Sequence, residues 1–340
     1  MMATRRVTIV EVARKAGVSP TAVSFAFNKP HRLNGDTTER ILQAARELGY
    51  APNPHARALL SQRIGVIGVL VPQSLYAIYA NPFFATFLQG IGSVCDDQDL
   101  ALLTVSPLDG SLERAIASAP VDGFIIVGLN EHHHEVAPLH KRRVPFVIVD
   151  GDAETVPSVN IDDESGAYAA AAHLLANGHR NILILTFETP LEHLEDIFYG
   201  VGGRRVHGYQ RAFADYGVPW RDDRLVPTLT SFEGGEQSFL NAWEAGTRPG
   251  AVLAVSDAMA LGVVKAAAQL GLNIPRDLEV IGFDDVPLAA LTNPALSTVH
   301  QPVYRKGEIA IELLVATLEA NVEPKSVVLP TELILRATTR

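Results

Sequence analysis

Beyond residue 63, short apolar runs alternate with segments of helical period, and this alternation limits the possible folds more than any other feature. The predicted strands are near-continuous apolar runs, as in buried parallel sheets, at Ile64–Val71, Ala101–Val105, Phe124–Gly128, Phe146–Asp150, Asn181–Thr186, Ala251–Ser256 and Glu279–Phe283. The predicted helices follow these strands, at about Phe83–Asp96, Leu112–Ser118, Gly166–Asn177, Arg204–Tyr216, Gly235–Ala245, Ala258–Leu270 and Val303–Ala320. Repeated strand–helix units predict a doubly wound α/β fold. Roughly 275 residues exceed one such sheet, so we expect two similar parallel-sheet subdomains.

The 340 residues are enough for two or three domains. The predicted division is an all-α helix-turn-helix head at 1–51, a hinge or linker at 52–63, a first subdomain at 64–161 plus 294–320, and a second subdomain at 162–293 plus 321–340. Two subdomains of this kind place a small-molecule site in the cleft between them, which hinge closure can cover.

Charge is unevenly distributed along the chain. Residues 1–63 carry ten Lys and Arg against four Asp and Glu, whereas the whole chain has a net charge of −10. The head is therefore +6 and the remainder −16. A basic head on an acidic body indicates two functions in one chain, with the head suited to phosphates and the body repelled by them. The alternative is a solvated charge bias without functional meaning.

The first 50 residues predict short helices in a helix-turn-helix arrangement. Thr8-Ile9-Val10-Glu11 is a capping box that starts a helix ending at Gly17. Ser19 is a good N-cap, and Pro20 at the first helical position starts a second helix through about Phe27. The turn between these helices is only a few residues long, which is the helix-turn-helix spacing.

A third helix, from about Asp36 to Leu48, can be capped by Asn34 and ends at Gly49. In a helix-turn-helix unit the second helix enters the major groove with its N-terminal residues at the base edges. The exposed candidates for base contacts are Pro20, Thr21 and Phe25, and those for phosphate contacts are Arg5, Arg6, Lys29 and Arg32. The alternative is a small helical bundle that binds no nucleic acid.

Residues 52–61 can form one or two helical turns. Asn53 can cap and Pro54 can start such a helix, but an isolated helix this short is marginal in water. We expect coil until a partner holds it, and a plain linker is the alternative.

These motifs together resemble a known family. The stretch Val7–Ser19, with Val23-Ser24 and Asn28, and the stretch Ala44–Asn53, followed by Ala56–Leu59, closely resemble the head of the lactose-repressor (LacI/GalR) family. The resemblance implies a sequence-specific DNA-binding headpiece and a homodimer on a pseudo-palindromic operator. It also implies a hinge helix in the minor groove, where Leu59 matches the leucine that wedges open a base step.

The DNA-binding residues implied by the resemblance are Thr8, Ser19, Pro20, Thr21, Ser24, Phe25, Asn28, Arg32, Tyr50, Asn53, Ala56, Arg57 and Leu59. Pro20 and Phe25 depart from the best-known members at base-reading positions. Pro20 has no side-chain donor, and Phe25 offers only apolar contact, for example to a thymine methyl group. The operator sequence is therefore not transferable from a relative.

Polar side chains gather where the predicted strands end. Asp150 ends one strand, Ser256-Asp257 and Asp284-Asp285 follow others, and Arg205 lies at the start of a helix. Ligands of such sheets bind outside the carboxyl ends of the strands. Carboxylates, arginine and aromatic rings suit a sugar, because they bind hydroxyl groups and stack on the apolar ring face. The alternative for each aspartate is an ordinary helix cap.

The body resembles the same family over nearly all its length. The matching strings are His173-Leu174-Leu175, Gly178-His179-Arg180, Arg205–Tyr209, Ser256–Gly262, Val280–Asp285 and Leu296–Pro302. The resemblance implies a periplasmic-binding-protein-like effector domain, in which Arg205 and Asp284 match residues that hold sugar hydroxyls. The candidate effector-binding residues are Phe83, Phe84, Asp162, Arg205, Ser256, Asp257, Phe283 and Asp284. Ser256 stands where several sugar-binding members have asparagine.

The function predicted is a transcription regulator, a repressor, whose operator affinity is controlled by a sugar or sugar derivative. A nucleobase or nucleoside effector, and an activator, remain alternatives within the family. A solute-binding protein needs a secretion signal and has no use for the head. An α/β enzyme needs a catalytic constellation, and no Walker loop, dinucleotide fingerprint or nucleophile elbow occurs in the sequence. No cofactor and no catalytic residue is predicted.

Two features bear on location and metal binding. No run of about 18 apolar residues occurs, and the single cysteine, Cys95, cannot form an internal disulfide, so we expect a cytoplasmic protein without a membrane span. His132-His133-His134 is interpreted as a surface run, because three consecutive histidines cannot all face one ion from a helix. No metal is predicted.

Overall fold

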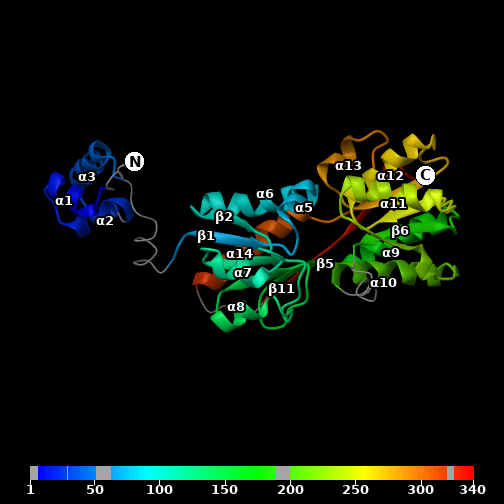
Figure 1. The fold of residues 1–340 in the computed structure, drawn as a ribbon, viewed down its shortest axis with the longest axis horizontal. Coiled ribbons are helices and arrows are strands. Elements are labelled where there is room, and N and C mark those ends of the chain that lie inside the picture. The colour runs from blue at the N-terminus through cyan, green and yellow to red at the C-terminus, as the bar shows by residue number, and fades with distance from the viewer. Residues whose placement is uncertain (1–6, 29, 51–62, 189–199, 320–324) are drawn as a thin grey trace. The chain divides into compact units, whose positions relative to one another are not determined.

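The structure is a computed structural model that describes residues 7–28, 30–50, 63–188, 200–319 and 325–340. The chain divides into two compact units, Met1–Ile64 and Gly65–Arg340. Figure 1 shows the helical first unit and the two sheets of the second unit with their flanking helices.

The first unit is the expected helical head. Its elements are α1 (Ile9–Ala16), α2 (Pro20–Asn28), the 3-10 turn η1 (Pro30–Arg32) and α3 (Gly35–Leu48). At the start of α1, the Glu11 carboxylate accepts hydrogen bonds from the Thr8 backbone N–H at 2.8 Å and from the Thr8 hydroxyl at 2.9 Å. The predicted helix ends at Gly17 and Gly49 are confirmed, since both glycines adopt the left-handed conformation at a φ of 66°.

One apolar cluster holds the three helices of the head together. Val12 of α1, Val23 of α2 and Ile41 of α3 are fully buried, and small residues fill the space between them. The Asn34 side chain accepts from the backbone N–H of Thr37, as predicted for the cap of α3. The helix-turn-helix geometry therefore follows from short-range caps and one shared core.

The second unit contains two six-stranded sheets among its described residues. The first sheet has the order β11-β5-β4-β3-β1-β2, with β1 Val66–Leu70, β2 Ala101–Val105, β3 Gly123–Val127, β4 Phe146–Val149, β5 Ser158–Ile161 and β11 Ser326–Leu329. The second has the order β12-β10-β9-β8-β6-β7, with β6 Ile182–Phe187, β7 Leu225–Thr228, β8 Ala251–Ala254, β9 Glu279–Asp284, β10 Ser297–His300 and β12 Glu332–Ile334. The two orders correspond strand for strand, so the prediction of two similar subdomains is confirmed.

Helices cover both faces of the sheets. Those of the first subdomain are α5 Leu75–Ala80, α6 Pro82–Asp97, α7 Leu112–Ser118, α8 Ala137–Arg142 and α14 Val303–Glu319. Those of the second are α9 Asp163–Ala176, α10 Gly200–Asp215, α11 Phe232–Glu244, α12 Asp257–Gln269 and α13 Pro287–Leu291, with a 3-10 turn η3 at Asp222–Arg224. In β3, Ile125 packs on the α6 and α14 side and Ile126 packs on the α7 and α8 side, as strand alternation requires.

All seven predicted strands and all seven predicted helices of this unit are present, but eight short elements were missed. They are the strands β5, β7, β10, β11 and β12 and the helices α5, α8 and α13. Each missed strand has three or four residues and each missed helix five or six. Segments this short do not show a recognisable hydrophobic period in the sequence.

The predicted subdomain boundaries differ from the sheets near the C-terminus. Strand β10 falls within 294–320, assigned to the first subdomain, but pairs with β9 of the second sheet. Strand β11 falls within 321–340, assigned to the second subdomain, but pairs with β5 of the first sheet. The cause is that the chain crosses between the subdomains three times, after β5, after β10 and after β11. Each subdomain is therefore built from separate stretches of the chain that the predicted boundaries did not separate correctly.

Helices α6 and α14 cross at two glycines, Gly90 and Gly307, where the two backbones are in direct contact. A Cβ atom on Gly90 would lie 2.0 Å from the Tyr304 carbonyl oxygen, and one on Gly307 would lie 2.3 Å from the Phe87 carbonyl oxygen. Both contacts are to backbone, which cannot move aside as a flexible side chain does. The close approach fixes α14, and with it the side chains that α14 directs at the cleft.

We expect Gly90→Ala to destabilise the protein by about 1–3 kcal/mol or more, because the added methyl group forces the two helix backbones apart. Gly92→Ala, in the same helix with open space around its Cβ position, is the matched control. The control should be neutral or stabilising by up to about 1 kcal/mol, because alanine is the better helix former. Urea unfolding measures both, and equal effects of the two substitutions would contradict the close crossing.

Candidate functional site

A cavity of about 290 Å³ lies where the switch points of the two sheets meet. In each sheet the strand order reverses direction between two central strands, β1 and β3 in the first and β6 and β8 in the second. Residues at the carboxyl ends of these four strands line the cavity, namely Val71, Gly128 and Val255 directly after their strands and Phe187 at the end of β6. This is where open α/β sheets bind ligands.

Aromatic rings from both subdomains line the cavity. Phe83 and Phe84 begin α6 and pack edge to face with ring centroids 5.3 Å apart. The Asn81 side chain caps this helix by accepting from the Phe83 N–H at 3.0 Å, so the local sequence Asn81-Pro82 fixes where the rings lie. Phe187 of β6 also lines the cavity. These rings provide apolar surface for a ligand ring.

Arg205 of α10 lines the cavity and is almost completely buried. Its Nε donates to Asp163 at 2.9 Å, its NH1 donates to the Val255 carbonyl at 2.5 Å, and its guanidinium lies 3.6 Å from the centroid of the Phe283 ring. Burial lowers the pKa of Arg205, but the carboxylates of Asp163 and Asp284 raise it by more. The guanidinium is therefore a fixed, charged donor at the cavity wall.

A buried hydrogen-bonded network crosses the cavity from one subdomain to the other. Lys306 of α14, with no exposed surface, donates to both Asp150 oxygens at 2.7 and 2.9 Å and to the Gln301 Oε1 at 2.5 Å. Gln301 in turn donates to an Asp284 oxygen at 2.6 Å. Asp150 follows β4 of the first sheet, and Asp284 ends β9 of the second. Both carboxylates line the cavity and remain able to accept further hydrogen bonds.

The two cavity carboxylates occupy unusual backbone positions. Asp150 has a φ of 56° and Asp284 a φ of 126°, positive values that residues with a Cβ atom adopt only rarely. Burial, and to a lesser extent the charge of Asp150, raise the pKa of Asp284 to about 6 against the opposing effect of Arg205, Gln301 and Lys306. Such strain persists only where the surrounding structure holds it, and it is concentrated at ligand sites.

Five of the eight candidate effector residues line the cavity, namely Phe83, Phe84, Arg205, Ser256 and Asp284. The other three lie elsewhere. Asp162 caps α9 through the Ser165 N–H, and Phe283 lies beneath the Arg205 guanidinium. Asp257 is fully buried and accepts from the Thr298 hydroxyl and the Val286 N–H, so it joins α12, β10 and the segment after β9.

Sequence reasoning missed Gln301 and Lys306 as parts of the site. Lys306 occupies the buried face of α14, where Val303, Ala310 and Ile311 recur at helical spacing. A lysine at an apolar position of an amphipathic helix is the signal that could have found it, because a buried ammonium requires an anionic partner.

The structure also places the candidate DNA-binding residues of the head. Pro20 and Thr21 are exposed at the start of α2, and the Ser19 hydroxyl accepts from the Ala22 N–H as its cap. Phe25 is half-buried with the Arg32 guanidinium 5.7 Å from its ring centroid. Thr8 caps α1, Tyr50 packs against Phe27, Ser24 is half-buried on α2, and Asn28 ends α2. Asn53, Ala56, Arg57 and Leu59 lie outside the described residues.

Comparisons with known proteins agree with both units. Residues 8–53 match the model of bacterial regulatory proteins of the lacI family, and residues 171–339 match a periplasmic binding protein-like domain. The chain is 33% identical to the HTH-type transcriptional repressor PurR of Vibrio campbellii, over 98% of each protein. The chain belongs to the LacI family.

Two solved structures of LacI-family regulators support the fold. The transcriptional regulator CelR in complex with cellobiose is 25% identical, with a TM-score of 0.71 over 98% of this chain and all of that one. The lac repressor dimer bound to operator is 24% identical, with a TM-score of 0.80 over 98% of this chain and 99% of that one. As a LacI-family member, the chain is a DNA-binding transcription regulator and not an enzyme. None of the helices in the described part of the chain is long and apolar enough to cross a membrane.

The raised pKa of Asp284 predicts how stability depends on pH. Between about pH 4 and pH 6 the folded chain keeps a proton on Asp284 that the unfolded chain loses, so stability falls as pH rises through this window. Asp284→Asn removes this contribution. Urea unfolding across the window should show the variant gaining stability relative to the wild type as pH rises. Parallel pH profiles of the two proteins would show that Asp284 titrates normally.

Proposed function

We propose that this LacI-family regulator is a cytoplasmic, homodimeric repressor whose operator affinity is set by an uncharged, hydroxyl-rich effector, a sugar, in the cavity. The network of Asp150, Lys306, Gln301 and Asp284 carries this proposal. Its two carboxylates line the cavity and can only accept hydrogen bonds while ionised. A ligand must therefore supply donors, and sugar hydroxyls do so.

The charge balance of the cavity argues against an anionic effector. Lys306 is enclosed by Asp150 and Gln301, and Arg205 is paired with Asp163 beside Asp284. Two carboxylates, Asp150 and Asp284, line the cavity against one cation, Arg205, so a phosphate or carboxylate group would meet a net negative lining whose cation is already paired. An anion buried without a partner costs several kcal/mol.

The rings of Phe83, Phe84 and Phe187 complete the proposed site. A pyranose has an apolar face of C–H groups and a rim of hydroxyls, which match a lining of aromatic rings, carboxylates and a guanidinium. The CelR complex, whose protein is 25% identical over nearly the whole chain, contains cellobiose. The cavity of about 290 Å³ is at the small end for ligand pockets, which favours a sugar of one or two rings.

In this proposal, ligand binding in the cavity controls the operator affinity of the head. The cavity lies between two subdomains that the chain joins by three crossings. A ligand that contacts both sheets favours one relation between them. In a dimer, that relation biases whether the two hinge segments can pair on DNA, with a typical coupling free energy of about 1–3 kcal/mol. The repressor assignment follows PurR of Vibrio campbellii, and the dimer follows the operator-bound lac repressor.

A thermal-shift series tests the effector class. We expect glucose or cellobiose to raise the melting temperature by mass action, and glucose 6-phosphate to leave it unchanged. Asp284→Asn should abolish the shift, whereas Asp97→Asn, at the exposed end of α6, should retain it. A shift with glucose 6-phosphate alone would overturn the uncharged effector, and one with adenine alone would support a nucleobase.

The hinge assignment is tested by Leu59→Ala. Loss of the side chain that wedges the minor groove should weaken binding to a selected operator duplex by at least roughly tenfold, while non-specific DNA binding and sugar binding stay unchanged. Leu60→Ala is the matched control and should have a smaller effect. Fluorescence anisotropy with labelled DNA measures both, and a Leu59→Ala protein with wild-type operator affinity would refute the wedge.

A further inference from the structure

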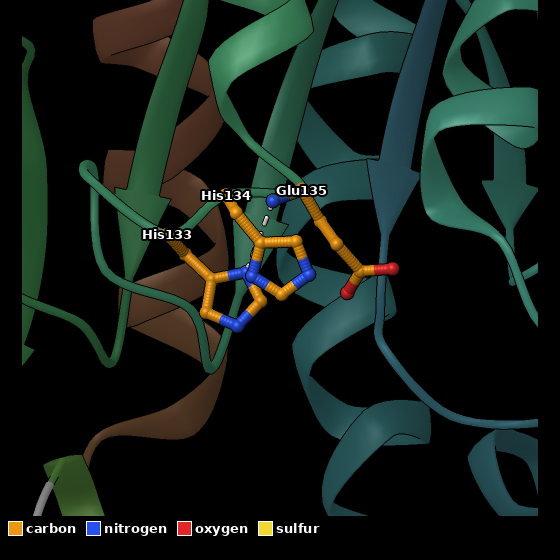
Figure 2. Close-up of side chains that lie close together, drawn as sticks. All are labelled: His133, His134 and Glu135. Atoms are coloured by element: carbon orange, nitrogen blue, oxygen red, sulfur yellow. Dashed lines mark hydrogen bonds between the residues drawn. The ribbon is translucent and has the colours of Figure 1, made fainter.

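Three neighbouring side chains come together on a loop that plays no part in the cavity network. Residues 128–136 connect β3 to the start of α8, and His133, His134 and Glu135 lie within this loop. One ligand atom from each of the three residues lies within 4.8 Å of the others. Figure 2 shows the three side chains projecting to the same side of the loop.

The backbone of this loop is held in place from both sides. Glu131, with 1% of its surface exposed, accepts from the backbone N–H groups of Glu154 at 2.6 Å and Thr155 at 2.8 Å, which ties the loop to the segment after β4. On the other side Val136 is fully buried, and its N–H donates to the His133 carbonyl at 2.8 Å. The three side chains therefore extend from a fixed turn, which lowers the entropy lost when they bind a common ligand.

The side chains offer ligand atoms that a metal ion can bind. His133 is half-buried on the turn. Its Nδ1 accepts from the Glu135 N–H at 3.3 Å, a long bond that a metal ion at this ring would replace. The Glu135 Oε1 accepts from the Leu112 N–H at 3.3 Å, and a carboxylate has further lone pairs to offer.

We propose that His133, His134 and Glu135 form a site for one divalent transition-metal ion of the Zn²⁺ type, with water completing its coordination. Two imidazoles and one carboxylate are ligands that Zn²⁺, Ni²⁺ and Cu²⁺ prefer, whereas Mg²⁺ and Ca²⁺ prefer oxygen ligands alone. Tetrahedral zinc ligands lie roughly 3.3 Å apart. The ligand atoms now lie within 4.8 Å of one another, so the proposal requires the exposed His134 and the Glu135 side chain to rotate when the ion binds.

This site differs from the surface run predicted for the three consecutive histidines. His132 does not belong to the cluster, and its Nε2 lies 3.8 Å from a Glu154 oxygen. The residues adopt a turn instead of a helix, and for this reason two neighbouring histidines and the following glutamate can face one point.

Isothermal titration of Zn²⁺ into the full chain without a histidine tag, near neutral pH, tests the site. The wild type should bind one equivalent of Zn²⁺ that His134→Ala and Glu135→Gln each weaken by roughly tenfold or more. His132→Ala is the matched control and should keep this equivalent. Unchanged melting temperatures of the three metal-free variants would show that each change acts on the site and not on the fold.

Two results would overturn the site. The first is a wild type that takes up no Zn²⁺. The second is Zn²⁺ uptake that His134→Ala and Glu135→Gln leave unchanged, which would place the ion on other residues. Magnesium serves as the ion control, and it should give no heat that these substitutions remove.

Discussion

The buried pair of Lys306 and Asp150 is the interaction on which the effector domain depends most. An ammonium group without exposed surface costs several kcal/mol to bury, and only a close anion with additional hydrogen bonds compensates that cost. Here the Asp150 carboxylate and the Gln301 amide provide them. Because Gln301 also holds Asp284, one buried cation sets the positions of both carboxylates that line the cavity.

This network also explains why the two subdomains form one functional unit. Its members come from β4 and α14 on one side and from β9 and the crossover after β10 on the other. The close crossing of α6 and α14 at Gly90 and Gly307 fixes the helix that carries Lys306. A ligand bound to Asp150 and Asp284 therefore contacts both subdomains at once. In our proposal, this is how an event in the cavity reaches a DNA-binding head attached to the same chain.

Local features of the fold were readable from the sequence, because they depend on neighbours in the chain. The helix ends at Gly17 and Gly49, the cap at Asn34 and the long strands all follow from local rules. Strands of three or four residues, such as β10 and β11, were not readable, because their pairing partners lie far away in sequence. The crossings of the chain shifted the subdomain boundaries for the same reason.

The residues of the site also differ in whether the sequence alone could predict them. The rule that ligands bind at strand ends, together with the family resemblance, predicted Arg205, Asp284, Phe83 and Phe84, and all four line the cavity. The same rule also selected Asp162 and Asp257. A carboxylate at a strand end can equally well cap a helix or link two segments, and the sequence does not distinguish these roles from ligand binding. Lys306 was missed because its partner Asp150 lies 156 positions away.

A double-mutant cycle on this pair is the most direct test. Lys306→Met should lower the free energy of unfolding by about 3–5 kcal/mol, because it leaves the buried Asp150 carboxylate without its cation. Asp150→Asn should cost a comparable amount, and the double variant should recover most of the loss, since no unpaired charge remains. Urea unfolding of the four proteins measures the coupling. Losses that simply add in the double variant would show that Lys306 and Asp150 act independently and would contradict the account.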